Sequence, residues 1–387
     1  MDRRPPLRSA ALLWALAWVL YVLKGLVQPD KPGVYPIFAA AARHWWEGRP
    51  LYEPYPGIDI FRYPPTFAVV FTPFAALPDL LGGALWNLTS MVVLWAALRT
   101  TARRLLAVDW TPRQEALFLI LTLVGTLRGL WSAQTNALLI ALVLFATIAV
   151  HHRRWWPAAT LLAAAVAIKL WPLALVALLA SVWPRPLIGR FLAACAAFAA
   201  VPFLTRPWGE VLTEYASFHA VLERTAPLRW RGYRDAWTLL EQLGPVDGRF
   251  YLALQVGGAA LVLLWCHWQR LRLRSEPRLL YAVLAAWVSW QLLLGPATER
   301  LTYGIVAPFL AVALLESRGR AQRALAIAAA LMVAILGSGE AERALLPLLP
   351  MAAAIQPAGV LVFVIWLVVS HWQLPEREAS QQAGQRT

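Results

Sequence analysis

The sequence has few charged residues. Asp, Glu, Lys and Arg make up only 14% of its 387 positions, whereas 60% are hydrophobic. Soluble domains usually carry about 25% charged and 45–50% apolar residues, so this shortage excludes an ordinary soluble enzyme or binding module. Apolar stretches long enough to cross a bilayer recur along the chain instead, starting at residues 10–27. The composition is typical of a polytopic, all-α membrane protein.

Cysteine is almost missing as well. Cys195 and Cys266 each lie within an apolar stretch, which excludes a disulfide framework and a cysteine metal centre. The chain also lacks a glycine-rich nucleotide loop and the HExxH, GxSxG and CxxC motifs. The DxD signature of nucleotide-sugar transferases is missing too, because Asp59 has Gly57 two residues before it and Phe61 two after. The sequence therefore predicts neither a metal site nor a cofactor.

The charges that do occur are mostly positive, with 35 Lys and Arg against 21 Asp and Glu. In a soluble protein this excess would suggest nucleic acid as a partner. Here the arginines cluster between apolar stretches, as cytoplasmic loops that orient membrane proteins do, so we expect no nucleic acid. The Arg- and Ala-rich composition is typical of a GC-rich bacterial genome, which would make the membrane the inner one and its outer face periplasmic.

If every Arg-rich loop between the apolar stretches is cytoplasmic, an even number of crossings must separate each pair of such loops. This predicts about twelve crossings, with both termini cytoplasmic, in a single domain over 1–375 followed by a polar cytoplasmic tail at 376–387. The expected hairpins pair 10–27 with 81–98, 114–128 with 136–151, 156–168 with 170–183, 188–204 with 250–268, 279–295 with 304–316, and 322–338 with 351–371. Residues 65–78 are left over as a re-entrant or interfacial segment.

The same argument concerns the stretch VAIKLWPLAL, residues 166–175, where a chain that avoids lysine places Lys169 in apolar sequence. Arg clusters lie on both sides of residues 155–184, so this stretch must turn round once within itself, at Lys169 and Pro172. A lysine at the bilayer centre would cost several kcal/mol, whereas one at a helix end reaches the headgroups. We therefore expect Lys169 at the external surface, facing either an anion or a carboxylate.

Two expected external segments, 28–80 and 205–249, are too long for simple turns and mix Trp, Tyr, Arg and acidic residues. Val34 to Glu47 has the spacing of an interfacial helix. Asp30 and Asp59 in the first segment are candidate general bases at the lipid–water boundary. Alternatively these acids solvate a loop or pair with Arg62 or Lys31.

Two further expected outer turns carry polar residues. RGLWSAQTNALL, residues 128–139, holds Arg128, Gln134 and Asn136, whose amides either contact a ligand or join helices. GPATERLTYG, residues 295–304, holds Glu299 and Arg300, and Arg300 either binds phosphate or pairs with Glu299 or a neighbouring loop. Topology alone assigns these cations, Lys169, Arg62 and the carboxylates to one membrane face. Such a set suits a lipid phosphate donor and a hydroxyl acceptor.

Several segments in this order resemble glycosyltransferase family 87, the polyprenol-phosphate-mannose-dependent mannosyltransferases with the GT-C fold. They are VYPIFAAAARHWWEGRPLY, FRYPPTFAVVFTPFAALP, SAQTNALLIAL, AVAIKLWPLAL and GPATERLTYG, and the resemblance runs from about Val34 to Pro308. It implies inverting, metal-independent transfer of a hexose from a polyprenyl phosphate on the external face. It also implies a catalytic aspartate just before the Val–Tyr pair.

The chain departs from this pattern at a few positions. Asp30 lies one residue further from Val34 than expected, which leaves Asp59 as an alternative base. Ala133 stands where a glycine is expected before Gln134, and no histidine lies near Arg300.

The sequence thus predicts a membrane glycosyltransferase acting on a polyprenyl-phosphate-linked sugar and a lipid or glycan acceptor among membrane lipids. Lys169, Arg128 and Arg300 are the expected phosphate ligands. The expected sugar and acceptor pocket comprises Tyr35, Arg62, Tyr63, Gln134, Asn136 and Glu299. One alternative is a flippase or transporter of lipid-linked sugars, although the chain has no two related halves. Another alternative is a non-catalytic subunit of a membrane assembly.

Overall fold

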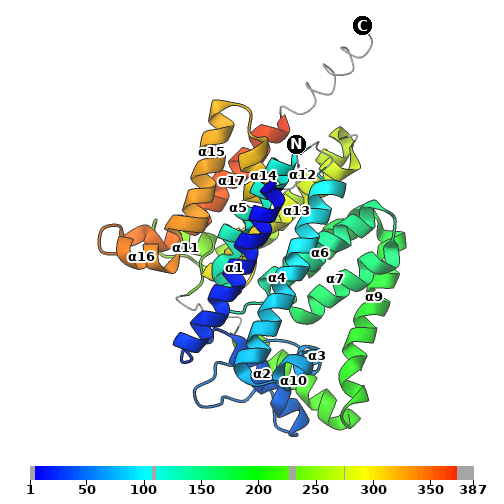
Figure 1. The fold of residues 1–387 in the computed structure, drawn as a ribbon. Helices are drawn as coiled ribbons and strands as arrows, with labels where there is room; N and C mark the ends of the chain where they lie inside the picture. The colour runs from blue at the N-terminus through cyan, green and yellow to red at the C-terminus, as the bar shows by residue number, and fades with distance from the viewer. Residues whose placement is uncertain (1–4, 107–109, 226–231, 274, 373–387) are drawn as a thin grey trace. The chain divides into compact units, whose positions relative to one another are not determined.

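A computed structural model describes residues 5–106, 110–225, 232–273 and 275–372 (Figure 1). Over these ranges the protein is helical, and its extended backbone pairs only at two isolated bridges, Tyr55 with Ile58 and Tyr233 with Glu299. The predicted all-α class is confirmed. The polar tail expected at 376–387 lies outside the described residues.

The chain divides into two compact units. Residues 1–104 and 127–230 form the first, and residues 105–126 and 231–387 form the second, with the long helix α5 contributing to both. The helices of the first unit are α1 (Pro5–Val27), α2 (Tyr35–Trp46), α3 (Pro65–Ala75), α4 (Asp79–Arg104), the end of α5 (Pro112–Trp131), α6 (Asn136–His151), α7 (Trp155–Ile168), α8 (Leu173–Val182), α9 (Pro184–Ala200), η1 (Val201–Leu204) and α10 (Trp208–Thr225). Those of the second are the start of α5, α11 (Ala236–Leu240), α12 (Gly248–Arg272), α13 (Glu276–Leu294), η2 (Arg300–Val306), α14 (Ala307–Glu316), α15 (Arg320–Ala330), η3 (Leu331–Leu336), α16 (Gly339–Leu345), η4 (Pro350–Ala354) and α17 (Ile355–Trp372).

All twelve segments predicted to cross the membrane contain helix. Among the described helices, six are long and apolar enough to cross by themselves, and the bent pair Arg320–Leu336 and Gly339–Leu345 makes a possible seventh. The helices α6, α7 and α8 are apolar but shorter. The protein is therefore a multi-pass membrane protein by the character of its helices, while the count of twelve crossings stays a prediction.

In the first unit α4, α6, α7 and α9 lie side by side (Figure 1). The Arg153 guanidinium lies 5.8 Å from the ring centre of Trp155 and 5.6 Å from that of Trp183. The stretch from 155 to 183 therefore begins and ends at the same place. Its turn occurs at residues 169–172, between α7 and α8, so the predicted reversal at Lys169 and Pro172 is confirmed.

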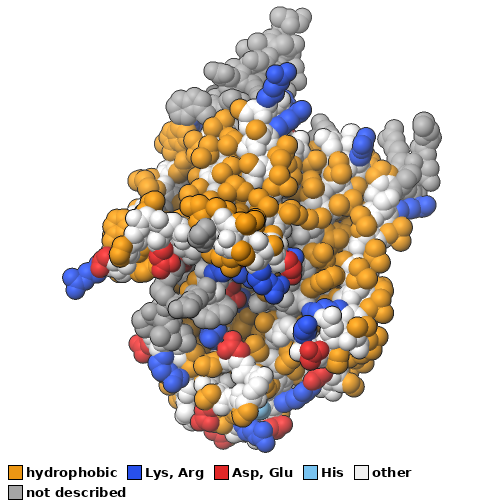
Figure 2. All heavy atoms as spheres, turned by 90° about the vertical axis from the view of Figure 1, so that its left-hand side faces the viewer, with side chains coloured by type: hydrophobic (Ala, Val, Ile, Leu, Met, Phe, Trp, Pro, Cys, Tyr) orange, Lys and Arg blue, Asp and Glu red, His pale blue; other side chains and the backbone are white. Residues whose placement is uncertain are grey.

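The helix predicted between Val34 and Glu47 is present as α2, and it packs on α3, while its interfacial position stays a prediction. Aromatic side chains fill the space between them. The ring centre of Phe38 on α2 lies 5.1 Å from that of Phe67 and 5.4 Å from that of Phe71, both on α3. The eleven residues of α3 rise only about 16 Å, half of a bilayer core, so this helix is too short to cross a bilayer by itself. Figure 2 shows one face of the molecule, with hydrophobic side chains over much of it and acidic and basic side chains gathered in groups between them.

Helix α10 lies in the expected external segment 205–249 and was not predicted. It buries Val211, Phe218 and Val221 in the same aromatic core as α2 and α3. Glu214 on this helix is only 7% exposed, and its carboxylate accepts a hydrogen bond from the Leu51 amide at 3.2 Å. Burial raises the pKa of Glu214, against the lowering effects of the Leu51 amide and the Arg206 charge.

Glu214 should make stability depend on pH. Because its pKa is raised on folding, the folded state holds more protons than the unfolded state above the ordinary glutamate pKa, so stability falls as pH rises through that window. We expect Glu214→Gln to raise the unfolding midpoint at pH 7 in detergent micelles and to flatten its decline between pH 4 and 8. Glu223→Gln, at an exposed position of the same helix, is the matched control and should shift stability by at most ~0.5 kcal/mol. Equal pH profiles for wild type and Glu214→Gln would contradict this account.

Candidate active site

Lys169 ends α7 with an extended backbone, and its ammonium donates a hydrogen bond to the Asn136 Oδ1 at 3.2 Å. The same ammonium lies 5.5 Å from the centre of the Tyr63 ring. Three predicted site residues from separate segments are thus brought together. Within the described ranges Lys169 forms no ion pair with a carboxylate. Since an ammonium has three donors, this lysine can bind an anion while keeping its contact with Asn136.

Gln134 and Asn136 are 7% and 4% exposed. Gln134 lies in the turn at residues 130–135, which includes the last two residues of α5, and Asn136 is the first residue of α6. Ala133 in this turn has a φ of 54°, a left-handed conformation that favours glycine. This explains physically why a glycine is expected at that position. The Trp86 indole donates to the Ala133 carbonyl at 2.9 Å and holds the turn in place.

The same turn is fixed from other directions. The Asn87 amide donates to the Leu130 carbonyl at 2.6 Å, and the Lys24 ammonium donates to the Trp131 carbonyl at 3.1 Å. The Val34 amide donates to the Ser132 carbonyl at 2.9 Å. Helices α1 and α4 and the loop before α2 therefore all bind one short turn. Arg128 lies exposed on the last turn of α5, four residues before Ser132.

Asp30 lies in the loop that reaches this turn. Its side chain is exposed and, in the part of the chain that the structure describes, it takes part in no hydrogen bond or ion pair. Gly33 makes the approach possible, because its φ is +74° and a Cβ there would lie 2.5 Å from the Ser132 carbonyl oxygen. Asp30 thus lies four residues before Val34, whose amide bonds to the turn that holds Gln134 and precedes Asn136.

Gly33→Ala should break this contact. Gly48 offers a matched control, since its φ of +73° is nearly the same but a Cβ there would meet nothing within 4 Å. Both variants carry the left-handed strain of about 1–2 kcal/mol, and only Gly33→Ala adds a clash costing roughly 1–3 kcal/mol more. Hydrogen exchange measured by mass spectrometry should quicken at Val34 in Gly33→Ala and stay unchanged there in Gly48→Ala. Unchanged exchange in both variants would show that the contact does not hold the loop.

Asp59, the alternative base, is engaged differently. Its carboxylate lies 3.6 Å from the Arg62 guanidinium and accepts a hydrogen bond from the Ile60 amide at 2.8 Å. The pairing with Arg62 that the sequence left open is therefore formed. Both side chains are exposed, and in the described part of the chain neither forms a hydrogen bond or ion pair with Lys169 or the turn at 130–135.

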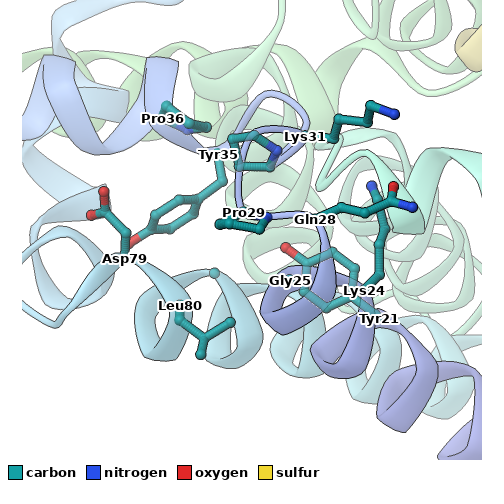
Figure 3. Close-up of a pocket in the computed structure, with 12 residues that line it drawn as sticks. Tyr21, Lys24, Gly25, Gln28, Pro29, Lys31, Tyr35, Pro36, Asp79 and Leu80 are labelled. Atoms are coloured by element: carbon teal, nitrogen blue, oxygen red, sulfur yellow. The ribbon is translucent and has the colours of Figure 1, made fainter.

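Tyr35, predicted to line the sugar pocket, is 2% exposed in the aromatic core, and its hydroxyl donates to the Phe74 carbonyl at 3.0 Å. It borders a cavity of about 170 Å³ that the sequence did not predict. Lys24 and Lys31 also line that cavity, which lies beside the Asp30 loop (Figure 3). The scarcity of lysine could have pointed to this cavity, because the chain has only three lysines, Lys24, Lys31 and Lys169.

Arg300 and Glu299 belong to the second unit. The Arg300 guanidinium lies 2.9 Å from the Glu342 carboxylate, which also accepts hydrogen bonds from Arg234 at 2.5 and 3.1 Å. The backbone of Glu299 pairs with that of Tyr233 in an isolated bridge. Arg300 is therefore bound to a buried acid, one of the two alternatives that the sequence allowed, and Arg234 and Glu342 are partners that sequence spacing did not reveal.

Residues 61–296 match the model of glycosyltransferase family 87. The chain belongs to this family. The resemblance found in its motifs is thereby confirmed for most of their extent.

Two curated relatives come from Mycobacterium tuberculosis. The polyprenol-phosphate-mannose-dependent alpha-(1-2)-phosphatidylinositol mannoside mannosyltransferase of strain ATCC 25618 / H37Rv is 27% identical over 59% of this chain and 54% of its own length. The polyprenol-phosphate-mannose-dependent alpha-(1-2)-phosphatidylinositol pentamannoside mannosyltransferase of strain CDC 1551 / Oshkosh is 33% identical over 29% of this chain and 26% of its own. The chain thus spans about half the length of the first relative and a quarter of the second.

Among solved structures, the chain is similar to ArnT from Cupriavidus metallidurans bound to undecaprenyl phosphate. The sequences are 14% identical, the TM-score is 0.47, and the match covers 95% of this chain and 77% of ArnT.

Proposed function

We propose that this protein is a membrane glycosyltransferase that moves a hexose, mannose, from a polyprenyl phosphate to a lipid or glycan acceptor. The reaction inverts the anomeric carbon, needs no metal and takes place on the external face. Membership of family 87 and the names of the two mycobacterial relatives support the donor class and the sugar. The observation that carries the proposal is the Lys169 ammonium, held by Asn136 beside Tyr63 and paired with no carboxylate of the residues that the structure describes.

Lys169 would bind the phosphate of the donor. As the bond between the anomeric carbon and the phosphate oxygen breaks, its electron pair stays on the polyprenyl phosphate, and the nearby ammonium stabilises the charge that develops there. A lipid phosphate donor has no nucleotide diphosphate for a metal to neutralise. The buried amides of Gln134 and Asn136 can orient sugar hydroxyls beside it.

Asp30 is the general base in this proposal. It takes the proton of the acceptor hydroxyl while that oxygen forms the new bond to the anomeric carbon, opposite the departing phosphate. Asp30 suits this role better than Asp59, because Asp59 already pairs with Arg62 whereas the Asp30 carboxylate has no partner among the described residues.

The external position of the site rests on the arginines. Arg153 contacts Trp155 at the start of α7, and Arg104 at the end of α4 interacts electrostatically with His152. These basic groups gather at one end of the first unit, whereas Lys169 ends α7 about 21 Å further along its axis. Basic ends favour the cytoplasm, which supports an external Lys169 and cytoplasmic termini.

The two aspartates can be separated by transfer assays. In nanodiscs with radiolabelled polyprenyl-phosphate-mannose and a membrane lipid extract, Asp30→Asn should lower transfer by a factor of about 10²–10⁴, the usual contribution of a general base. Asp59→Asn should change it no more than a few-fold. The opposite ranking would make Asp59 the base. Label that crosses the bilayer unchanged, with no new product, would favour a flippase.

Lys169 should matter most for the departing phosphate. We expect Lys169→Ala to lower kcat by about 10²–10³, as loss of one electrostatic contact to a developing charge does. The same variant should weaken inhibition by free polyprenyl phosphate. Arg49→Gln removes an exposed positive charge from the same unit and is the control that should leave both measurements unchanged. Full inhibition of Lys169→Ala by polyprenyl phosphate would place the donor phosphate elsewhere.

A further inference from the structure

A cavity of about 170 Å³ lies where α1 ends, and its walls come from four segments of the first unit (Figure 3). Helix α1 supplies Tyr21 and Lys24, and the loop at 28–32 supplies Gln28 and Lys31. The beginnings of α2 and α4 close it with Tyr35, Pro36, Asp79 and Leu80. Figure 3 shows Lys24, Gln28 and Lys31 reaching one side of the view and Asp79 lying at the other.

The cavity has an excess of positive charge. Asp79, the acid among its lining residues, is paired with Arg43 of α2. Over the described ranges neither Lys24 nor Lys31 forms an ion pair with a carboxylate, and the two ammonium groups repel each other. The Lys24 ammonium uses one donor on the Trp131 carbonyl and keeps two. An anion bound between the lysines would replace this repulsion with attraction.

The surroundings of the cavity are suited to a lipid. Leu26 and Val27 at the end of α1 and Leu80 and Leu81 at the start of α4 are 42–77% exposed. Both helices are candidate membrane spans, so the cavity lies at the level where a span ends and headgroups begin. Lysines at such a level hold phosphate groups while acyl chains cover the neighbouring apolar side chains.

The cavity is also tied to the candidate active site. Lys24 contacts Trp131, and Lys169 contacts Asn136 five residues further along, so these two lysines contact the two ends of one short segment. Asp30 lies between Pro29 and Lys31, two lining residues of the cavity. Neither Asn136 nor Tyr63, the contacts of Lys169, lines the cavity, so the two cationic centres are separate.

We propose that this cavity binds the anionic, phosphate-bearing headgroup of the lipid acceptor, with Lys24 and Lys31 as its ligands. This assignment rests on the proposed function, in which Lys169 binds the phosphate of the donor. It gives the two lipid substrates separate phosphate centres on either side of the segment 131–136 and places the acceptor beside the loop that carries the proposed base.

Binding can be measured without turnover. The full chain in detergent micelles would be titrated with dioctanoyl phosphatidylinositol, dioctanoyl phosphatidylcholine or inorganic phosphate and followed by native mass spectrometry. The double variant Lys24→Gln/Lys31→Gln should bind the phosphatidylinositol at least tenfold more weakly than wild type, and Lys24→Arg/Lys31→Arg should restore binding. The control Arg49→Gln/Arg224→Gln removes the same charge from exposed positions of the unit and should bind as wild type does.

Three outcomes would overturn the assignment. They are equal phosphatidylinositol binding by wild type and the Lys→Gln double variant, equal binding of the zwitterionic lipid, and binding of inorganic phosphate as tight as that of the lipid.

Transfer kinetics then test the acceptor role. The Lys→Gln double variant should raise the KM for the lipid acceptor about tenfold and leave the KM for polyprenyl-phosphate-mannose unchanged. A rise in the donor KM alone would overturn the acceptor assignment. If wild-type protein transfers no label to any acceptor, the proposed function fails, while the titration still decides whether the cavity binds an anionic lipid.

Discussion

The turn at residues 130–135 is the constraint on which the candidate site depends. Its carbonyls at Leu130, Trp131, Ser132 and Ala133 accept hydrogen bonds from α4, α1 and the loop before α2. The Leu130 carbonyl also accepts from the Ala133 amide at 2.9 Å, whereas the other three have no further partner among the described residues. Near the end of an apolar helix, an unmet hydrogen bond costs on the order of 1–3 kcal/mol. Satisfying them draws together segments that are a hundred residues apart in the chain, and Asn136 follows directly at the start of α6.

The distribution of cations follows from this arrangement. All three lysines of the chain lie in the first unit, two contacting the segment 131–136 and one beside them in the cavity wall. At the other end of α7 the cation is an arginine, Arg153, which lies over the faces of Trp155 and Trp183. The planar guanidinium stacks well on aromatic rings, while a compact ammonium with rotatable donors adapts to a phosphate. The second unit holds Arg300 with Arg234 on the buried Glu342 instead.

Much of the architecture could be predicted from sequence. Apolar length located the twelve helical segments, and the spacing of arginines located the reversal at Lys169 because charge asymmetry acts over a whole hairpin. The neighbouring positions of Lys169, Asn136 and Tyr63 followed from topology, although their contacts did not. Helix α10 was missed because its polar face hides a narrow buried stripe, Val211, Phe218 and Val221, that is recognised only against its partner.

The remaining features depend on long-range contacts that leave no local pattern. The partners Arg300 and Glu342 are distant in sequence, and so are Leu51 and Glu214. The cavity at Lys24 and Lys31 forms only when α1 meets α4 and the loop folds over them. The left-handed backbone of Ala133 could be inferred only from the glycine expected there.

The central claim is that the phosphate of the polyprenyl donor binds at Lys169, on the side of the turn occupied by Asn136 and Tyr63. A cryo-electron microscopy map of the protein in nanodiscs with a polyprenyl phosphate would test it most directly. The account predicts phosphate density within hydrogen-bonding distance, about 3 Å, of the Lys169 ammonium. Phosphate density at Arg300 and Arg234 instead, with Lys169 still bound only to Asn136, would contradict it.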